Sequence, residues 1–257
     1  MQDSRLGRSP TQRAFRQGAF AGLAAAAVVL SGFCSPAAAV SVQNGSFSTV
    51  QTGHSSSYVL TPGNNTSVPS WNYQPNLGGA FGCMVINDTF NTACTNKIGP
   101  VTGGENPGFS PNGGNFIAIA TDASNNASIT QTLAGLVAGT KYNISFYQSA
   151  INDESGPASI EWVVTLGTTQ LNPSPVVMSP NADSSSPWSL QTLSFTATSA
   201  EVGNPMLKFL AQSTLAGGPP IALLDGVQVP EPASIALLGV GIAGLAGLRR
   251  RRARLAA

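Results

Sequence analysis

Residues 40–229 predict an all-β fold, a two-sheet antiparallel β-sandwich of the jelly-roll kind. Two observations carry this prediction. Short apolar runs rich in β-branched and aromatic residues alternate with clusters of Gly, Asn, Ser and Pro. Period-two alternation is clear at Tyr142, Ile144 and Phe146, with Asn143 and Ser145 pointing the other way. No stretch of these residues shows a capped helical period, so we expect no helix between the two ends of the chain.

Ten strands are expected, since that many runs stand between turn signals. A tight connection, Gly135–Thr140, precedes the strand that begins at Tyr142. Two turn-rich polar stretches, Gly103–Gly114 and Ser179–Pro187, are expected to be surface loops. The expected strands are Ser46–Val50, Tyr58–Thr61, Cys83–Ile86, Phe116–Thr121, Ala127–Leu133, Tyr142–Gln148, Ser159–Leu166, Leu190–Thr198, Met206–Ala211 and Ile221–Val229.

The first 39 residues have the three parts of a secretory signal peptide. A basic segment with four arginines precedes an apolar run from Ala19 to Phe33, and small residues follow at Pro36–Ala39. The apolar run is too short for a permanent membrane helix, which needs about 20 residues. We expect export by the Sec machinery and cleavage near Ala39. Cys34 follows a bulky Phe33, which is unlike a lipidation site, so it is expected to be lost with the signal.

The C-terminal residues 230–257 have three parts as well. Pro230-Glu231-Pro232 comes first, the uncharged stretch 233–248 follows, and an arginine cluster ends the chain. As a helix, residues 233–248 would cover about 24 Å, slightly less than the bilayer core, and arginine stems extend that reach. The positive-inside rule places the arginines in the cytoplasm and the sandwich outside. A plain single-pass anchor is the alternative interpretation.

This tail resembles the PEP-CTERM sorting signal, whose three parts occur in the same order. The resemblance covers Val229–Ala257 and implies recognition by an exosortase, a membrane cysteine-type transpeptidase that cleaves near the motif. Pro230, Glu231 and Pro232 would then be sorting residues rather than catalytic ones. The precursor would be anchored in the inner membrane, and the product would reach the cell surface or the extracellular matrix. Such proteins usually accompany exopolysaccharide production, so a role in a biofilm is implied.

The composition of residues 40–229 excludes a basic nucleic-acid footprint. Nine acidic residues stand against three lysines, a net charge of −6, because the arginines lie in the two terminal segments. Cys83 and Cys94 are the two cysteines of this region, and in an exported chain they predict one disulfide. Two free buried thiols are the alternative.

Three segments resemble the galactose-binding-like jelly rolls found in carbohydrate-binding modules. They are the opening segment 42–47, the middle blocks 113–118, 129–133 and 142–146, and the closing segment 223–229. The resemblance implies a final strand that pairs with the first, and a structural Ca²⁺ where they meet. Asn44 and Asp225 occupy the matching segments, although Ca²⁺ prefers six to eight oxygen ligands.

Three aromatic residues are candidates for carbohydrate binding, because sugars stack their C–H faces on flat rings. Trp71 and Tyr73 share a face if they lie on a strand, and Trp188 borders a polar loop. Trp162 is expected in the core. For enzymes, the single His54 lies in a Gly/Ser-rich loop, and Asp153, Glu154 and Glu161 are candidates for glycoside hydrolysis by residue type alone.

We therefore expect an exported surface or matrix protein that is not an enzyme and that binds carbohydrate. A purely structural or adhesive surface protein is the alternative, and a secreted glycan hydrolase is a more distant one. Exposure of Trp71 and Tyr73 would favour the first interpretation, and their burial would favour the second.

Overall fold

The computed structural model describes residues 40–63, 66–75, 80–98, 107–122, 124–152, 158–171, 176–179, 184–213 and 220–230, with Gly241 and Gly244. The predicted signal peptide, 1–39, lies outside the described residues. So do Glu231, Pro232 and most of the predicted membrane helix, 233–248. Among the residues described, no helix is both long enough and apolar enough to cross a membrane.

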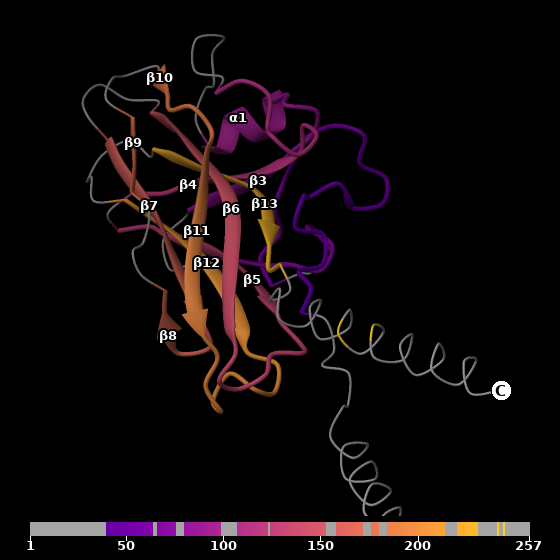
Figure 1. Cartoon of the computed structure of the whole chain (residues 1–257). Helices are drawn as coiled ribbons and strands as arrows, with labels where there is room; N and C mark the ends of the chain where they lie inside the picture. Colours follow the sequence, from indigo (N-terminus) through magenta and orange to yellow (C-terminus); the bar gives the residue numbers. More distant parts are fainter. Residues whose placement is uncertain are drawn as a thin grey trace, which may run out of the picture. The chain divides into compact units, whose positions relative to one another are not determined.

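The described chain folds into two antiparallel sheets that face each other (Figure 1). The seven-stranded sheet has the order β1 (Tyr58–Val59), β3 (Phe81–Val85), β4 (Phe116–Ala120), β13 (Ile221–Gln228), β6 (Lys141–Asn152) and β10 (Ser184–Ser185), and β11 (Ser189–Thr196) also pairs with β6. The six-stranded sheet has the order β2 (Asn72–Pro75), β5 (Ala127–Thr132), β12 (Met206–Ser213), β7 (Ala158–Leu166) and β8 (Thr169–Gln170), and β9 (Val176–Ser179) also pairs with β7.

The predicted all-β sandwich is thus confirmed, and nine of the ten expected strands have counterparts. The expected strand Ser46–Val50 is wrong, because this segment forms turns and irregular backbone. Gly45, the residue just before this segment, is joined to the last strand by a hydrogen bond from the Val227 amide to the Gly45 carbonyl at 2.9 Å. The sequence also missed the short strands β2, β8, β9 and β10.

The inner faces of the two sheets form the main core. The alternating residues Tyr142, Ile144 and Phe146 of β6 are all buried there, as the pattern predicted. Trp162 from β7 packs in the same core and donates its indole N–H to the Leu223 carbonyl at 3.2 Å. Its predicted place in the core is confirmed.

A second apolar cluster lies on strands of the seven-stranded sheet, next to the helix α1 (Thr92–Ile98). Cys83 on β3 and Cys94 on α1 form the predicted disulfide, with their Cα atoms 5.9 Å apart. The absence of any helix was a wrong prediction. Seven residues are too few to show a helical period, and α1 is stabilised by the disulfide and by Asn91, whose side-chain oxygen accepts the Cys94 amide at 3.1 Å.

Candidate functional site

The two aromatic residues expected to form a sugar platform are part of the core. Trp71 is fully buried, with its ring 5.8 Å from Phe47 and 6.2 Å from Phe209. Tyr73 is 2% exposed and donates its hydroxyl to the Ala80 carbonyl. Burial raises the pKa of the Tyr73 phenol well above its ordinary value. These two candidates therefore offer no exposed platform, because the shared face of these residues points inward.

Trp188 is the predicted platform residue that keeps part of its surface exposed. Its ring packs edge-on against Phe116, with centroids 5.3 Å apart, and its indole N–H donates to the Gly108 carbonyl at 3.3 Å. The hydrogen bond ties Trp188 to the loop of residues 107–115, which we call the 107–115 loop. The next residue of that loop, Phe109, is 86% exposed.

Two further side chains with exposed apolar surface come from β11 and β6. Leu190, two residues after Trp188, is 57% exposed, and its partner across the β11–β6 register is the half-buried Tyr147. Directly opposed residues of antiparallel strands share a face. We call the three aromatic side chains and the adjoining leucine together the aromatic patch: Phe109, Tyr147, Trp188 and Leu190. Strands β6 and β11 and the hydrogen-bonded 107–115 loop thus present apolar surface together with polar loop groups.

The 107–115 loop is held in place by a buried carboxylate. Asp225 of β13 is fully buried and accepts hydrogen bonds from the Ser110 hydroxyl at 2.7 Å and from the Asn112 amide at 3.1 Å. It also accepts the Gly226 amide at 2.5 Å. Desolvation raises the pKa of Asp225 to about 6, against the lowering effect of these donors, and the negative charge of Asp88 adds to the rise.

A second carboxylate, that of Asp88, supports the same loop. Asp88 accepts the Ser110 amide at 2.8 Å, so Ser110 bridges Asp88 and Asp225. Asn87 and Asp88 both have positive φ, 52° and 54°, between the bridged pair Ile86 and Thr89. Two left-handed residues in succession are typical of a type I′ hairpin turn. This turn positions Asp88 beside the loop.

The predicted calcium ligands do not share a hydrogen-bond partner. The side chain of Asn44 links Thr49 and Pro69, accepting the Thr49 amide at 2.9 Å and donating to the Pro69 carbonyl at 2.9 Å. Asp225 is occupied by Ser110, Asn112 and Gly226 as described above. Across the part of the chain that the structure describes, no group of three or more His, Cys, Asp or Glu side chains could hold a metal ion. The calcium prediction gains no support from this geometry.

The residues considered for catalysis are not brought together among those described. His54 is exposed, and its ring lies 4.0 Å from that of Tyr58. Glu161 is half-buried on β7. Asp153 and Glu154 fall outside the described residues.

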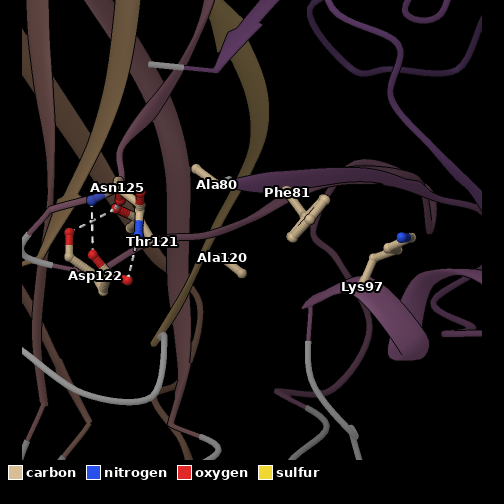
Figure 2. A pocket seen from close by; sticks show the side chains of 7 residues that line it. All are labelled: Ala80, Phe81, Lys97, Ala120, Thr121, Asp122 and Asn125. Atoms are coloured by element: carbon tan, nitrogen blue, oxygen red, sulfur yellow. Dashed lines mark hydrogen bonds between the residues drawn. The ribbon is translucent and has the colours of Figure 1, made fainter. Parts of the chain in front are cut away.

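A separate hollow of about 130 Å³ lies near the start of β3 (Figure 2). Phe81 is 38% exposed there, and the Lys97 ammonium stands 5.2 Å from the centre of its ring. Asp122 accepts the amides of Ser124 and Asn125 and the Asn125 side chain, each at 2.7 Å, and these bonds lower its pKa. Because its own turn occupies this carboxylate, the hollow offers a ligand little beyond Phe81 and Lys97.

The sequence indicated only part of the aromatic patch. Phe109 stands alone as a bulky residue in Pro107-Gly108-Phe109-Ser110-Pro111, and a large aromatic residue in a turn-rich segment is the one local signal for this part of the patch. No local pattern links this loop to Asp225, because the two are more than 100 positions apart.

Fold and site together define an all-β sandwich domain with an exposed aromatic patch. The C-terminal segment is more specific: residues 228–252 match the family model of the PEP-CTERM protein-sorting motif. The predicted sorting signal is therefore confirmed. Proteins with this motif are exported and sorted to the cell surface by an exosortase, and the motif marks this chain as an exosortase substrate.

Several solved structures align with most of this chain. A cyclase from Fischerella sp. TAU aligns with 16% identity over 76% of this chain and 98% of its own, with a TM-score of 0.46. The CBM22-1 xylan-binding domain from Paenibacillus barcinonensis has 16% identity over 72% of this chain and 89% of its own, with a TM-score of 0.38. TmCBM61, solved with β-1,4-galactotriose, has 12% identity over 74% and 97%, with a TM-score of 0.37. At these identities and TM-scores, none of these likenesses assigns a function to this chain. No curated protein matches the chain.

Proposed function

We propose that this chain is an exported surface or matrix protein whose sandwich binds neutral glycan through the aromatic patch. The observation that carries the proposal is a strongly exposed Phe109 on a loop that is fixed by buried hydrogen bonds and that accepts the Trp188 indole N–H at the neighbouring Gly108. Exposed aromatic rings on a fixed frame are suited to stacking against sugar C–H faces, since little conformational entropy is lost on binding.

The charge of the domain narrows the proposed ligand. Residues 40–229 carry a net charge of −6, which repels polyanions. We therefore propose neutral polysaccharides of an extracellular matrix in preference to acidic ones. In this proposal the inner membrane holds the precursor, exosortase processing delivers the domain to the surface or biofilm, and the chain performs no catalysis.

A purely structural surface protein is the second candidate. The burial of Trp71 and Tyr73 favours it, because it removes two of the three predicted binding residues. The two candidates differ in one respect that an experiment can address: only the glycan-binding protein needs the aromatic patch.

Affinity electrophoresis of residues 40–229 decides between these two candidate functions. The domain is run through gels that contain neutral polysaccharides or acidic ones, with calcium or with chelator. Phe109→Ala and Trp188→Ala are compared with Val202→Ala, which removes an apolar side chain that is 48% exposed and lies beyond the far end of β11.

We expect retardation in a neutral gel, weakened about tenfold or more by either aromatic substitution and unchanged by Val202→Ala. Equal mobility in every gel would leave the structural protein as the better proposal. Loss of retardation with chelator would add a cation to the binding mechanism.

A further inference from the structure

The folded sandwich continues to the residue that precedes the sorting motif. β13 lies inside the seven-stranded sheet, between β4 and β6, and its residues 221–227 are all buried. Val229, just after the strand, is 5% exposed and packs in the main core. Pro230 is the first exposed residue after it. The core and the Pro-Glu-Pro motif therefore adjoin without a linker.

The matched sorting motif overlaps this folded end. The family match begins at Gln228, which is the last residue of β13. Three residues, Pro230-Glu231-Pro232, separate buried Val229 from the apolar stretch that begins at Ala233. Even fully extended, three residues span only about 10 Å. An enzyme that works at the membrane surface thus has a very short accessible segment.

A processing enzyme must bind its substrate in an extended form on both sides of the bond that it cuts. Residues 221–224 of β13 pair with both β4 and β6, and Asp225 and Gln228 pair with β6. Val229 packs in the main core. Opening this strand would expose the centre of a sheet. The backbone upstream of Pro230 is for these reasons a poor substrate in the folded protein.

We infer that the exosortase cuts on the C-terminal side of Pro230, so that the product keeps the whole of β13 and Val229. One peptide C–N bond breaks. The carbonyl carbon of the retained residue gains an oxygen from water, or a nitrogen from an amine acceptor, and the released anchor gains a proton on its new amino group. The mature protein ends within a few residues of its core, so any group joined there is held against the sandwich.

The intact mass of the processed full-length protein, purified from the producing cells, tests this inference. We expect a single C-terminus at Pro230 or at a residue just after it. A plain carboxylate would identify water as the acceptor, and an added mass at that terminus would identify an amine. A terminus at Val229 or upstream would overturn the inference.

An insertion provides the second measurement. Three Gly-Ser pairs are placed between Val229 and Pro230, with the same insert placed in the exposed turn after Ala200 as a control for folding. If cleavage depends on the motif beyond the core, the product of the first variant keeps all six inserted residues. A product that has lost them would show cleavage next to the core and would also overturn the inference. Neither result depends on glycan binding.

Discussion

The hydroxyl of Ser110 donates to the buried carboxylate of Asp225 at 2.7 Å, across 115 positions of the sequence. This bond joins a loop to the central strand β13. Because the same loop carries Phe109 and contacts Trp188 through Gly108, the contact positions much of the aromatic patch. Buried hydrogen-bonded carboxylates are costly to leave unsatisfied, so changes here have predictable effects.

Ser110→Ala should loosen the loop. It removes one of three donors to Asp225 and the oxygen that accepts the Gly114 amide at 3.2 Å. We expect a loss of about 1–3 kcal/mol in the free energy of unfolding. Trp188 fluorescence should shift toward that of a more exposed indole, while Trp71 and Trp162 stay buried. Urea unfolding and emission spectra provide the measurement, and Ser46→Ala, at an exposed hydrogen bond, is the control. Equal effects of the two substitutions would contradict the prediction.

The stability of the protein should depend on the ionisation of Asp225. Its pKa rises from 3.8 to about 6 on folding, mainly through desolvation. Between about pH 4 and pH 6 the folded chain therefore binds more protons than the unfolded one, so stability falls as the pH rises through this window. At about 1.4 kcal/mol per pH unit, the contribution is on the order of 3 kcal/mol.

Asp225→Asn removes this titrating group while keeping the size of the side chain. We expect the difference in unfolding free energy between the native protein and the variant to change steadily from pH 4 to pH 6 and to level off above pH 7. Chemical denaturation at pH 4, 5, 6 and 7 measures it. A difference that does not vary with pH would mean that Asp225 titrates at its ordinary pKa.

Much of the sandwich was predictable because alternation and turn residues act locally. The buried series Tyr142, Ile144 and Phe146 is one example, and the Cys83–Cys94 pair is another. The helix around Cys94 was not predictable, since it is short and depends on tertiary contacts.

Local sequence patterns did not predict which aromatic side chains are buried and which are exposed. Spacing correctly suggested that Trp71 and Tyr73 share a face, but only the partner sheet determines which face is buried. The exposure of Phe109 depends on hydrogen bonds from its loop to Asp88 and Asp225, which lie far away in the sequence. No local signal predicts such contacts.

The tryptophans should differ strongly in their contribution to stability. Trp71→Ala would leave a cavity between Phe47 and Phe209 and should cost about 3–5 kcal/mol. Trp188→Ala removes a half-buried ring and should cost clearly less, so that its effect on glycan binding can be measured on a folded protein. Denaturant midpoints compare the two. Similar losses would indicate that Trp188 is a core residue rather than a binding residue.

The disulfide should stabilise the chain by restricting its unfolded state. Cys83 and Cys94 are 11 positions apart, and closing a loop of that size contributes about 2–3 kcal/mol. Reduction of the native protein should lower its unfolding free energy by this amount. The double variant Cys83→Ala/Cys94→Ala should be less stable from the start and insensitive to reductant. Native protein that reductant does not destabilise would contradict the prediction.

Gly226 should be the least replaceable residue where β13 contacts the 107–115 loop. It lies at the irregularity in the β13–β6 pairing with a φ of 62°, which side chains other than glycine rarely adopt. A Cβ there would also stand 1.8 Å from the side-chain nitrogen Nδ2 of Asn112 and 3.0 Å from the Tyr147 ring. Gly226→Ala therefore strains the backbone and also displaces two side chains. These are Asn112 in the 107–115 loop and Tyr147 in the aromatic patch.

Gly139→Ala is the matched control for this substitution, because Gly139 has a φ of 78° and open space around its Cβ position. It should cost about 1–2 kcal/mol through backbone strain alone. Gly226→Ala should cost more and should also weaken glycan retardation, because Asn112 and Tyr147 must move. Adding Asn112→Gly to Gly226→Ala should recover part of the lost stability by removing the nearest collision. Equal losses at the two glycines, with no recovery in the double variant, would show that backbone strain accounts for the whole effect and that Asn112 does not press on β13.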